Sequence, residues 1–166
     1  MKNHFCLFIL CCVCFSGFCQ TPEQKLEQLG ITLPEVTAPS ANFLKWRKTG
    51  NLLFLSGDGS NLKGKLGKDL TVEEGYEAAR QTGIEIIATL KAACGDLGKI
   101  KQFVKVRGMV NSTSDFYDQP KVINGFSDLM VQVFGEKGKH ARAAVGHCAL
   151  PSNIALEIEV IVELEE

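Results

Sequence analysis

The C-terminal part of the chain alternates between apolar and acidic positions. In residues 154–162 an apolar side chain occupies every second position, and Glu157 and Glu159 stand between them. A period of two residues is typical of a β-strand with one buried face. Residues 141–148 are also strand-like, and their small side chains leave open space around Arg142. The side chains expected to share one face of this strand are Arg142, Ala144, Gly146 and Cys148.

Periodicity and terminating residues predict the other elements. Thr71 and Glu74 have capping-box spacing, so a helix is expected from there to about Ala93, with Gly95 as its end. The remaining expected elements are a short helix from Thr21 to Gly30, an extended linker over 33–39, strands over 43–47, 52–56 and 100–110, a helix from Pro120 to Gly135, and exposed loops over 57–69 and 136–139.

The order strand–strand–helix–strand–helix–strand–strand predicts an α+β domain, with two helices on one face of a mixed sheet. Two helices leave the other face of the sheet bare. In the register above, that bare face would carry Arg142, Ala144, Gly146 and Glu157 together with much apolar surface. We therefore expect self-association to bury it.

Charge and composition exclude some functions. The chain has 166 residues, which fits one domain, and a formal net charge of −1. It has no basic patch with interleaved aromatic residues, so we expect no nucleic-acid partner. The histidines and cysteines do not have the spacing of a zinc site, and we predict no metal.

Residues 1–19 have the pattern of a secretory signal peptide. A short basic start precedes an apolar run from Phe5 to Cys19, and cleavage is expected near Cys19. The mature protein would then be secreted or periplasmic and free of the membrane. A lipoprotein signal and an uncleaved anchor are the alternatives. Five of the seven cysteines fall in this segment. The other two, Cys94 and Cys148, could form a disulfide or remain free thiols.

Three blocks of the sequence resemble the RidA/YjgF family of reactive-intermediate deaminases, also called endoribonuclease L-PSP. They are residues 50–57, residues 122–126 and a C-terminal block in which Arg142 is followed by Leu150-Pro151 and by Glu157-Ile-Glu159. The resemblance runs from about residue 40 to the end of the chain. Together with the pattern at the start of the chain, it gives a signal peptide (1–19), a short helix and linker (20–40) and a RidA/YjgF-like domain (41–166).

The resemblance implies a chorismate-mutase-like α+β fold that assembles as a homotrimer with clefts between subunits. It implies hydrolysis of enamines and imines, such as 2-aminoacrylate, to 2-oxoacids and ammonia without a cofactor or metal. The expected ligand is a small carboxylate-bearing imine or enamine, or a 2-oxoacid. The alternatives are a trimer of the same fold that binds such a metabolite without turnover, and a ribonuclease. Only the old family name suggests a ribonuclease. The chain lacks a histidine pair for RNA cleavage, which argues against that alternative.

The same resemblance assigns roles to five residues. Arg142 would hold the substrate carboxylate as a bidentate fork, and Glu157 would orient the attacking water. The other three would line the cleft, and they are Phe43, Ser56 and Asn124. Phe43 stands where better-known members have tyrosine, and Ala144 replaces a cysteine found in several members.

Structural roles are the alternatives at each position. Arg142 could bridge subunits, Glu157 could be a solvated or interface carboxylate, and Asn124 could be a helix-surface amide. Ser56 is read as a hydrogen-bonding wall residue, not as a nucleophile. The remaining polar residues near the site are read as structural or surface groups, and they are Glu159, His147 on the strand face opposite Arg142, and His140 in a surface loop.

Overall fold

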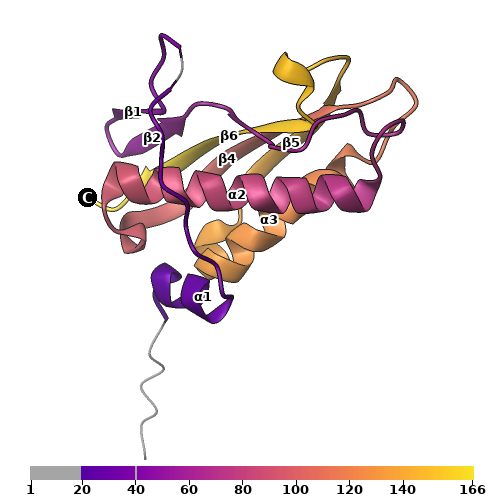
Figure 1. Cartoon of the computed structure of the whole chain (residues 1–166). Helices are drawn as coiled ribbons and strands as arrows, with labels where there is room; N and C mark the ends of the chain where they lie inside the picture. Colours follow the sequence, from indigo (N-terminus) through magenta and orange to yellow (C-terminus); the bar gives the residue numbers. More distant parts are fainter. Residues whose placement is uncertain (1–19, 40) are drawn as a thin grey trace, which may run out of the picture.

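The computed structural model describes residues 20–39 and 41–166 (Figure 1). The predicted signal peptide lies outside the described residues. The strands lie in the order β1-β2-β6-β4-β5, and the short strand β3 also pairs with β6. The strand bounds are β1 Trp46–Thr49, β2 Leu52–Leu55, β3 Asp58–Gly59, β4 Ile100–Asn111, β5 Ala141–His147 and β6 Leu156–Leu164.

The helices are α1 (Pro22–Gln28), α2 (Val72–Cys94) and α3 (Gln119–Phe134). α2 and α3 lie side by side on one face of the sheet, as Figure 1 shows. The predicted capping box of α2 is confirmed: the Thr71 side chain accepts from the backbone N–H of Glu74, and the Glu74 side chain accepts from that of Thr71. Gly95 follows with φ of 76°, which favours glycine at a helix end. None of the described helices is long and apolar enough to cross a membrane.

The predicted α+β architecture is confirmed, and β6 has the predicted alternation. Its apolar residues from Leu156 to Leu164 are buried at every second position, beneath the helices. Glu157 and Glu159 lie between them and are half-buried on the uncovered face. The hairpin is also confirmed, with β1 shifted a few residues along the chain from the prediction.

Two expectations about the sheet and its loops are wrong. Residues that pair across neighbouring strands lie on the same face of the sheet. Val106 pairs with Arg142 on one side and with the buried Val160 on the other, so Arg142 lies on the helix-covered face and not on the bare face. Ala144 and Gly146 share that face with it. The segment 57–69 is not simply an exposed loop, because it contains β3 and the fully buried Leu66. That side chain anchors the segment to the core.

Gly125 allows α2 and α3 to pack closely. A Cβ atom at this position would overlap the backbone carbonyl of Tyr76 and crowd the backbone N of Arg80, both on α2. A backbone neighbour cannot rotate away, so a larger residue must force the helices apart.

We expect Gly125→Ala to lower the free energy of unfolding by about 2 kcal/mol or more, in the upper part of the range for overpacked cores. Helix propensity alone would act in the opposite direction by about 1 kcal/mol. Denaturant midpoints of the wild type and of Gly125→Ala measure the sign. Lys121→Ala on the exposed side of α3 is the control and should change little. A raised midpoint for Gly125→Ala would show that the helix contact is looser than the structure indicates.

Candidate functional site

Arg142 lies on the edge strand β5 and reaches the side of α3. Its Nη1 donates to Asn124 Oδ1 at 2.8 Å and to Ser127 Oγ at 3.0 Å. Residues three apart on a helix project from the same side, so Asn124 and Ser127 together form the cradle. Both bonds use one terminal nitrogen, and a guanidinium has five N–H donors in all. The half-buried fork therefore keeps donors that can bind an anion at the edge of the sheet.

A hydrogen-bonded chain fixes the cradle behind Arg142. His140 Nδ1 lies 2.7 Å from the carbonyl oxygen of Gly138, and His140 Nε2 lies 3.0 Å from Ser127 Oγ. A carbonyl can only accept, so Nδ1 carries the proton and Nε2 accepts from the Ser127 hydroxyl. The same hydroxyl oxygen is then the acceptor for Arg142. Every hydrogen bond in this series, from Arg142 through Ser127 to His140, thus has one donor and one acceptor.

His140 is therefore not the loop-surface residue that the sequence suggested. Its ring packs edge-on against Phe126, with centroids 5.8 Å apart. Burial lowers the pKa of His140 below its ordinary value of 6.5; the bond to the Gly138 carbonyl opposes this, and the charge of Arg142 adds to it. The ring is therefore neutral at neutral pH, as the hydrogen-bonded chain requires.

This lowered pKa predicts a pH-dependent stability. Below about pH 6.5 the unfolded chain takes up a proton on this ring that the folded protein resists, so folding becomes less favourable as pH falls towards the folded pKa. Above about pH 6.5 the ring is neutral in both the folded and the unfolded chain, and this loss of stability is absent. The measurement is the free energy of unfolding of wild type and His140→Gln between pH 5 and 8, conditions chosen around the histidine range. The wild-type-minus-variant difference should shrink on acidification, and a difference independent of pH would contradict the assignment.

Glu157 belongs to a second group of predicted residues, on the uncovered face. Gly57 makes room for it, because a Cβ atom on Gly57 would overlap the Glu157 carboxylate. Burial raises the pKa of Glu157, the neighbouring carboxylates of Glu159 and Asp58 raise it further, and His147 opposes them. A carboxylate with a raised pKa is a better proton acceptor than an ordinary glutamate. His147 lies on this face, opposite Arg142, as predicted.

Ser56 and Phe43 adjoin this second group through the chain around Gly57. The Ser56 hydroxyl donates to the carbonyl oxygen of Leu44 at 2.6 Å, and its backbone N–H donates to that of Lys45 at 2.9 Å. These bonds fix the segment that carries Phe43, whose side chain is 48% exposed. The hydrogen bond to Leu44 fixes the orientation of the Ser56 hydroxyl.

The five predicted residues thus form two groups. Arg142 and Asn124 lie together on the helix side of the sheet, whereas Glu157, Ser56 and Phe43 belong to the region around Gly57. Arg142 and Glu157 were expected on the same bare face of the sheet, and this is wrong: they lie on opposite faces, and β4 separates their strands β5 and β6. Ser127 was not predicted, although its three-residue spacing from Asn124 was a usable signal. Arg142 and Glu157 face opposite sides of the sheet, so one chain cannot bring them to one ligand.

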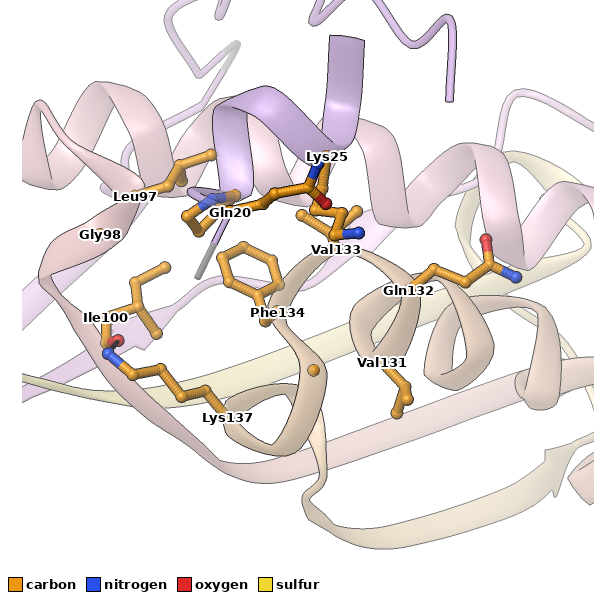
Figure 2. A pocket seen from close by; sticks show the side chains of 12 residues that line it. Gln20, Lys25, Leu97, Gly98, Ile100, Val131, Gln132, Val133, Phe134 and Lys137 are labelled. Atoms are coloured by element: carbon orange, nitrogen blue, oxygen red, sulfur yellow. Dashed lines mark hydrogen bonds between the residues drawn. The ribbon is translucent and has the colours of Figure 1, made fainter. Parts of the chain in front are cut away.

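A separate cavity of about 690 Å³ lies between α1, the end of α3 and the start of β4 (Figure 2). Its walls are mostly apolar, with Phe134 and Val133 among them, and Lys25 and Lys137 are its charged residues. None of the five predicted residues lines it. The described part of the chain also contains no group of three His, Cys, Asp or Glu side chains placed to hold a metal ion.

Comparison with known proteins agrees with this architecture. Residues 23–164 match a family model described as "YjgF/chorismate_mutase-like, putative endoribonuclease". Protein TCP17 of Trypanosoma cruzi is 42% identical over 147 residues, which are 84% of this chain and 92% of that protein.

Two solved structures extend the comparison. A crystal structure named as a putative endoribonuclease from Shewanella oneidensis is 37% identical, with a TM-score of 0.84, over 87% of this chain and all of that one. RidA from an Antarctic Psychrobacter is 28% identical, with a TM-score of 0.52, over 78% of this chain and 94% of that one. The match to the family model spans both groups of predicted residues and every strand of the sheet. The chain therefore belongs to the YjgF/RidA family.

Proposed function

We propose that this protein hydrolyses reactive enamine and imine intermediates to 2-oxo compounds and ammonia, without a cofactor, in clefts between subunits of a homotrimer. The observation that carries the proposal is that the predicted site residues form two groups on opposite faces of the sheet. Arg142 offers an anion fork at one edge of the sheet, and Glu157 offers a proton acceptor on the other face. Two copies of the chain are needed to complete one site.

The fork suits a substrate carboxylate. Guanidinium and carboxylate form paired, charge-assisted hydrogen bonds that a lysine would reproduce poorly. The Asn124 and Ser127 oxygens hold one terminal nitrogen in place, so the fork is oriented before a ligand arrives. Orientation before binding lowers the entropy lost when substrate binds.

Glu157 suits the water step. An enamine first takes a proton on carbon to give the imine. Water then adds to the imine carbon while Glu157 accepts a proton from it, and the C=N electron pair moves to nitrogen, which is protonated. The resulting carbinolamine loses ammonia as the C–N bond breaks and the C=O bond forms. The raised pKa of Glu157 brings the donor and acceptor forms of the carboxyl closer in energy, which favours both directions of transfer.

The uncovered face supports association of copies. Phe54 on β2 and Val145 on β5 lie on this face and are exposed in the single chain. Leu44, beside Ser56, is exposed as well. Exposed apolar side chains on a sheet face favour covering by another protein; here they lie on β2 and β5, and the two strands between them carry the Arg107–Glu159 ion pair on the same face. Association through this face would bring the β5 edge of one subunit, which carries Arg142, towards the uncovered face of another subunit, which carries Glu157.

The experiment is hydrolysis of an imine generated in solution by an amino-acid oxidase. The imine absorbance should decay faster with the protein than in buffer, and ammonia and the 2-oxoacid should form in equal amounts. Decay at the buffer rate would contradict the proposal. If a 2-oxoacid nevertheless stabilised the protein against heat through Arg142, the alternative of binding without turnover would replace it.

A further inference from the structure

A pocket of about 540 Å³ lies at the end of β5, and Glu157 is not among the residues that line it. Three segments form it: the loop around Lys65, the connection from β4 to α3, and the end of β5 from Gly146 to Cys148. Such a volume is in the range of small-molecule sites. Nothing in the proposed hydrolysis uses these residues.

Ser112 gives this pocket a polar group that lacks a partner. The residue is only 5% exposed and lines the pocket. Its Oγ lies 2.8 Å from where a Cβ atom of Gly146 would stand, so it faces the bare backbone of that glycine. Within the described part of the chain its hydroxyl makes no hydrogen bond. Thr113, which also lines the pocket, has a buried hydroxyl oxygen without a partner among the described residues, so a ligand that accepts protons from these hydroxyls would make hydrogen bonds that the folded chain leaves unmade.

Lys65 and Gln119 add free donors to the pocket. Lys65 Nζ donates to the carbonyl oxygen of Cys148 at 2.6 Å, and an ammonium has three donors, so two remain. The amide nitrogen of Gln119 donates to the Phe116 carbonyl at 2.6 Å and keeps its second N–H beside Gly146. No aspartate or glutamate lines the pocket.

The start of α3 adds to the positive potential. Gln119 is the first residue of this 16-residue helix, whose N-cap residue, Asp118, makes no capping hydrogen bond through its side chain. Asp118 pairs with Lys121 instead, at 3.0 Å. Pro120 has no N–H, and the N–H groups of Lys121 and Val122 donate to the Asp118 carbonyl oxygen at 3.0 and 3.2 Å, so the helix start contributes its dipole and not a set of free donors. The ring of Tyr117, 81% exposed, forms a wall on which a planar group can stack.

We propose that this pocket binds the oxyanion of a small organic molecule with a planar ring, a carboxylate or a phosphate, held by Ser112, Lys65 and Gln119. The site is distinct from Arg142. Gly146 lies four residues further along the same face of β5, which corresponds to about 13 Å at the rise of a β-strand.

Calorimetric titration of the full chain with benzoate and with phenyl phosphate tests this, with benzyl alcohol as the uncharged comparison. At least one of the two anions should bind saturably, and the alcohol should not. The titrations with benzoate and with phenyl phosphate distinguish a carboxylate site from a phosphate site. The anion that binds should do so equally well to Arg142→Met, so the result is independent of the proposed hydrolysis.

Variants locate the bound anion. Ser112→Ala should weaken binding about tenfold, the loss expected for one charge-assisted hydrogen bond. Gly146→Ala should weaken it at least as much, because its Cβ would crowd Ser112 Oγ and Gln119 Nε2 without changing charge. Lys68→Gln, in the same loop but outside the pocket, should have no effect. Thermal melts establish that each variant is folded. No saturable binding, equal losses with Lys68→Gln, or loss with Arg142→Met but not with Ser112→Ala would overturn the proposal.

Discussion

Replacing Arg142 with methionine should lower kcat/KM for a carboxylate-bearing imine about a hundredfold or more. Truncating one partner of a buried charge pair costs about 2–5 kcal/mol, and each 1.36 kcal/mol is a factor of ten in rate. Methionine keeps much of the apolar stem and removes the fork that Asn124 and Ser127 orient. Arg142→Lys should recover only part of the loss, because an ammonium cannot make the paired bonds.

The chain offers a matched control in Arg80 on α2. Its Nη1 donates to Gln132 Oε1 on α3 at 3.1 Å, the same kind of bond that Arg142 makes to Asn124. Arg80→Met should leave kcat/KM unchanged. The defect of Arg142→Met should also be much smaller for an imine that lacks a carboxylate. An equal defect on both imines would mean that Arg142 supports the fold of the edge strand and does not bind the substrate.

Glu157→Gln should lower kcat by about 10²–10⁴-fold, the usual contribution of a general base, and change KM little. Glutamine keeps the shape that packs against Gly57 and removes the proton acceptor. Glu157 acts as a base only when ionised, and its pKa is raised. The wild-type rate should therefore fall on acidification at a higher pH than for an ordinary glutamate, and this acid limb should be absent from the remaining activity of the variant.

Glu159 provides the comparison for Glu157. It lies two residues along the same face of β6 and forms a 3.9 Å ion pair with Arg107. Glu159→Gln should keep most of the wild-type kcat and should shift the acid limb slightly to lower pH, because the Glu159 charge contributes to raising the pKa of Glu157. Equal losses of kcat in Glu157→Gln and Glu159→Gln would show that the general charge of this face, and not one base, supports the reaction.

Local signals in the sequence predicted the elements well. A capping box at Thr71 and a glycine at position 95 fix the ends of α2 through bonds between near neighbours in the chain. The strict alternation of β6 likewise revealed its buried face, because Glu157 and Glu159 contrast with the apolar residues between which they lie.

The face of β5 could not be predicted in the same way. Alternation shows which side chains share a face, but residues 143–146 are all small or apolar on both sides of the strand. No contrast therefore identifies the buried side. The insertion of β6 between β2 and β4 was equally hidden, since strand order depends on pairing between distant segments. The role of His140 depends on packing against Phe126 and on a bond to Ser127, neither of which leaves a local pattern.

We propose that Arg142 and Glu157 serve one site from two different chains. Mixing refolded Arg142→Met subunits with Glu157→Gln subunits tests it directly, because each is inactive alone but supplies what the other lacks. Random assembly would give an intact pair at about one quarter of the subunit interfaces, so about a quarter of wild-type activity should return. If the mixed oligomers form but remain as inactive as the separate variants, the two residues do not meet across a subunit boundary.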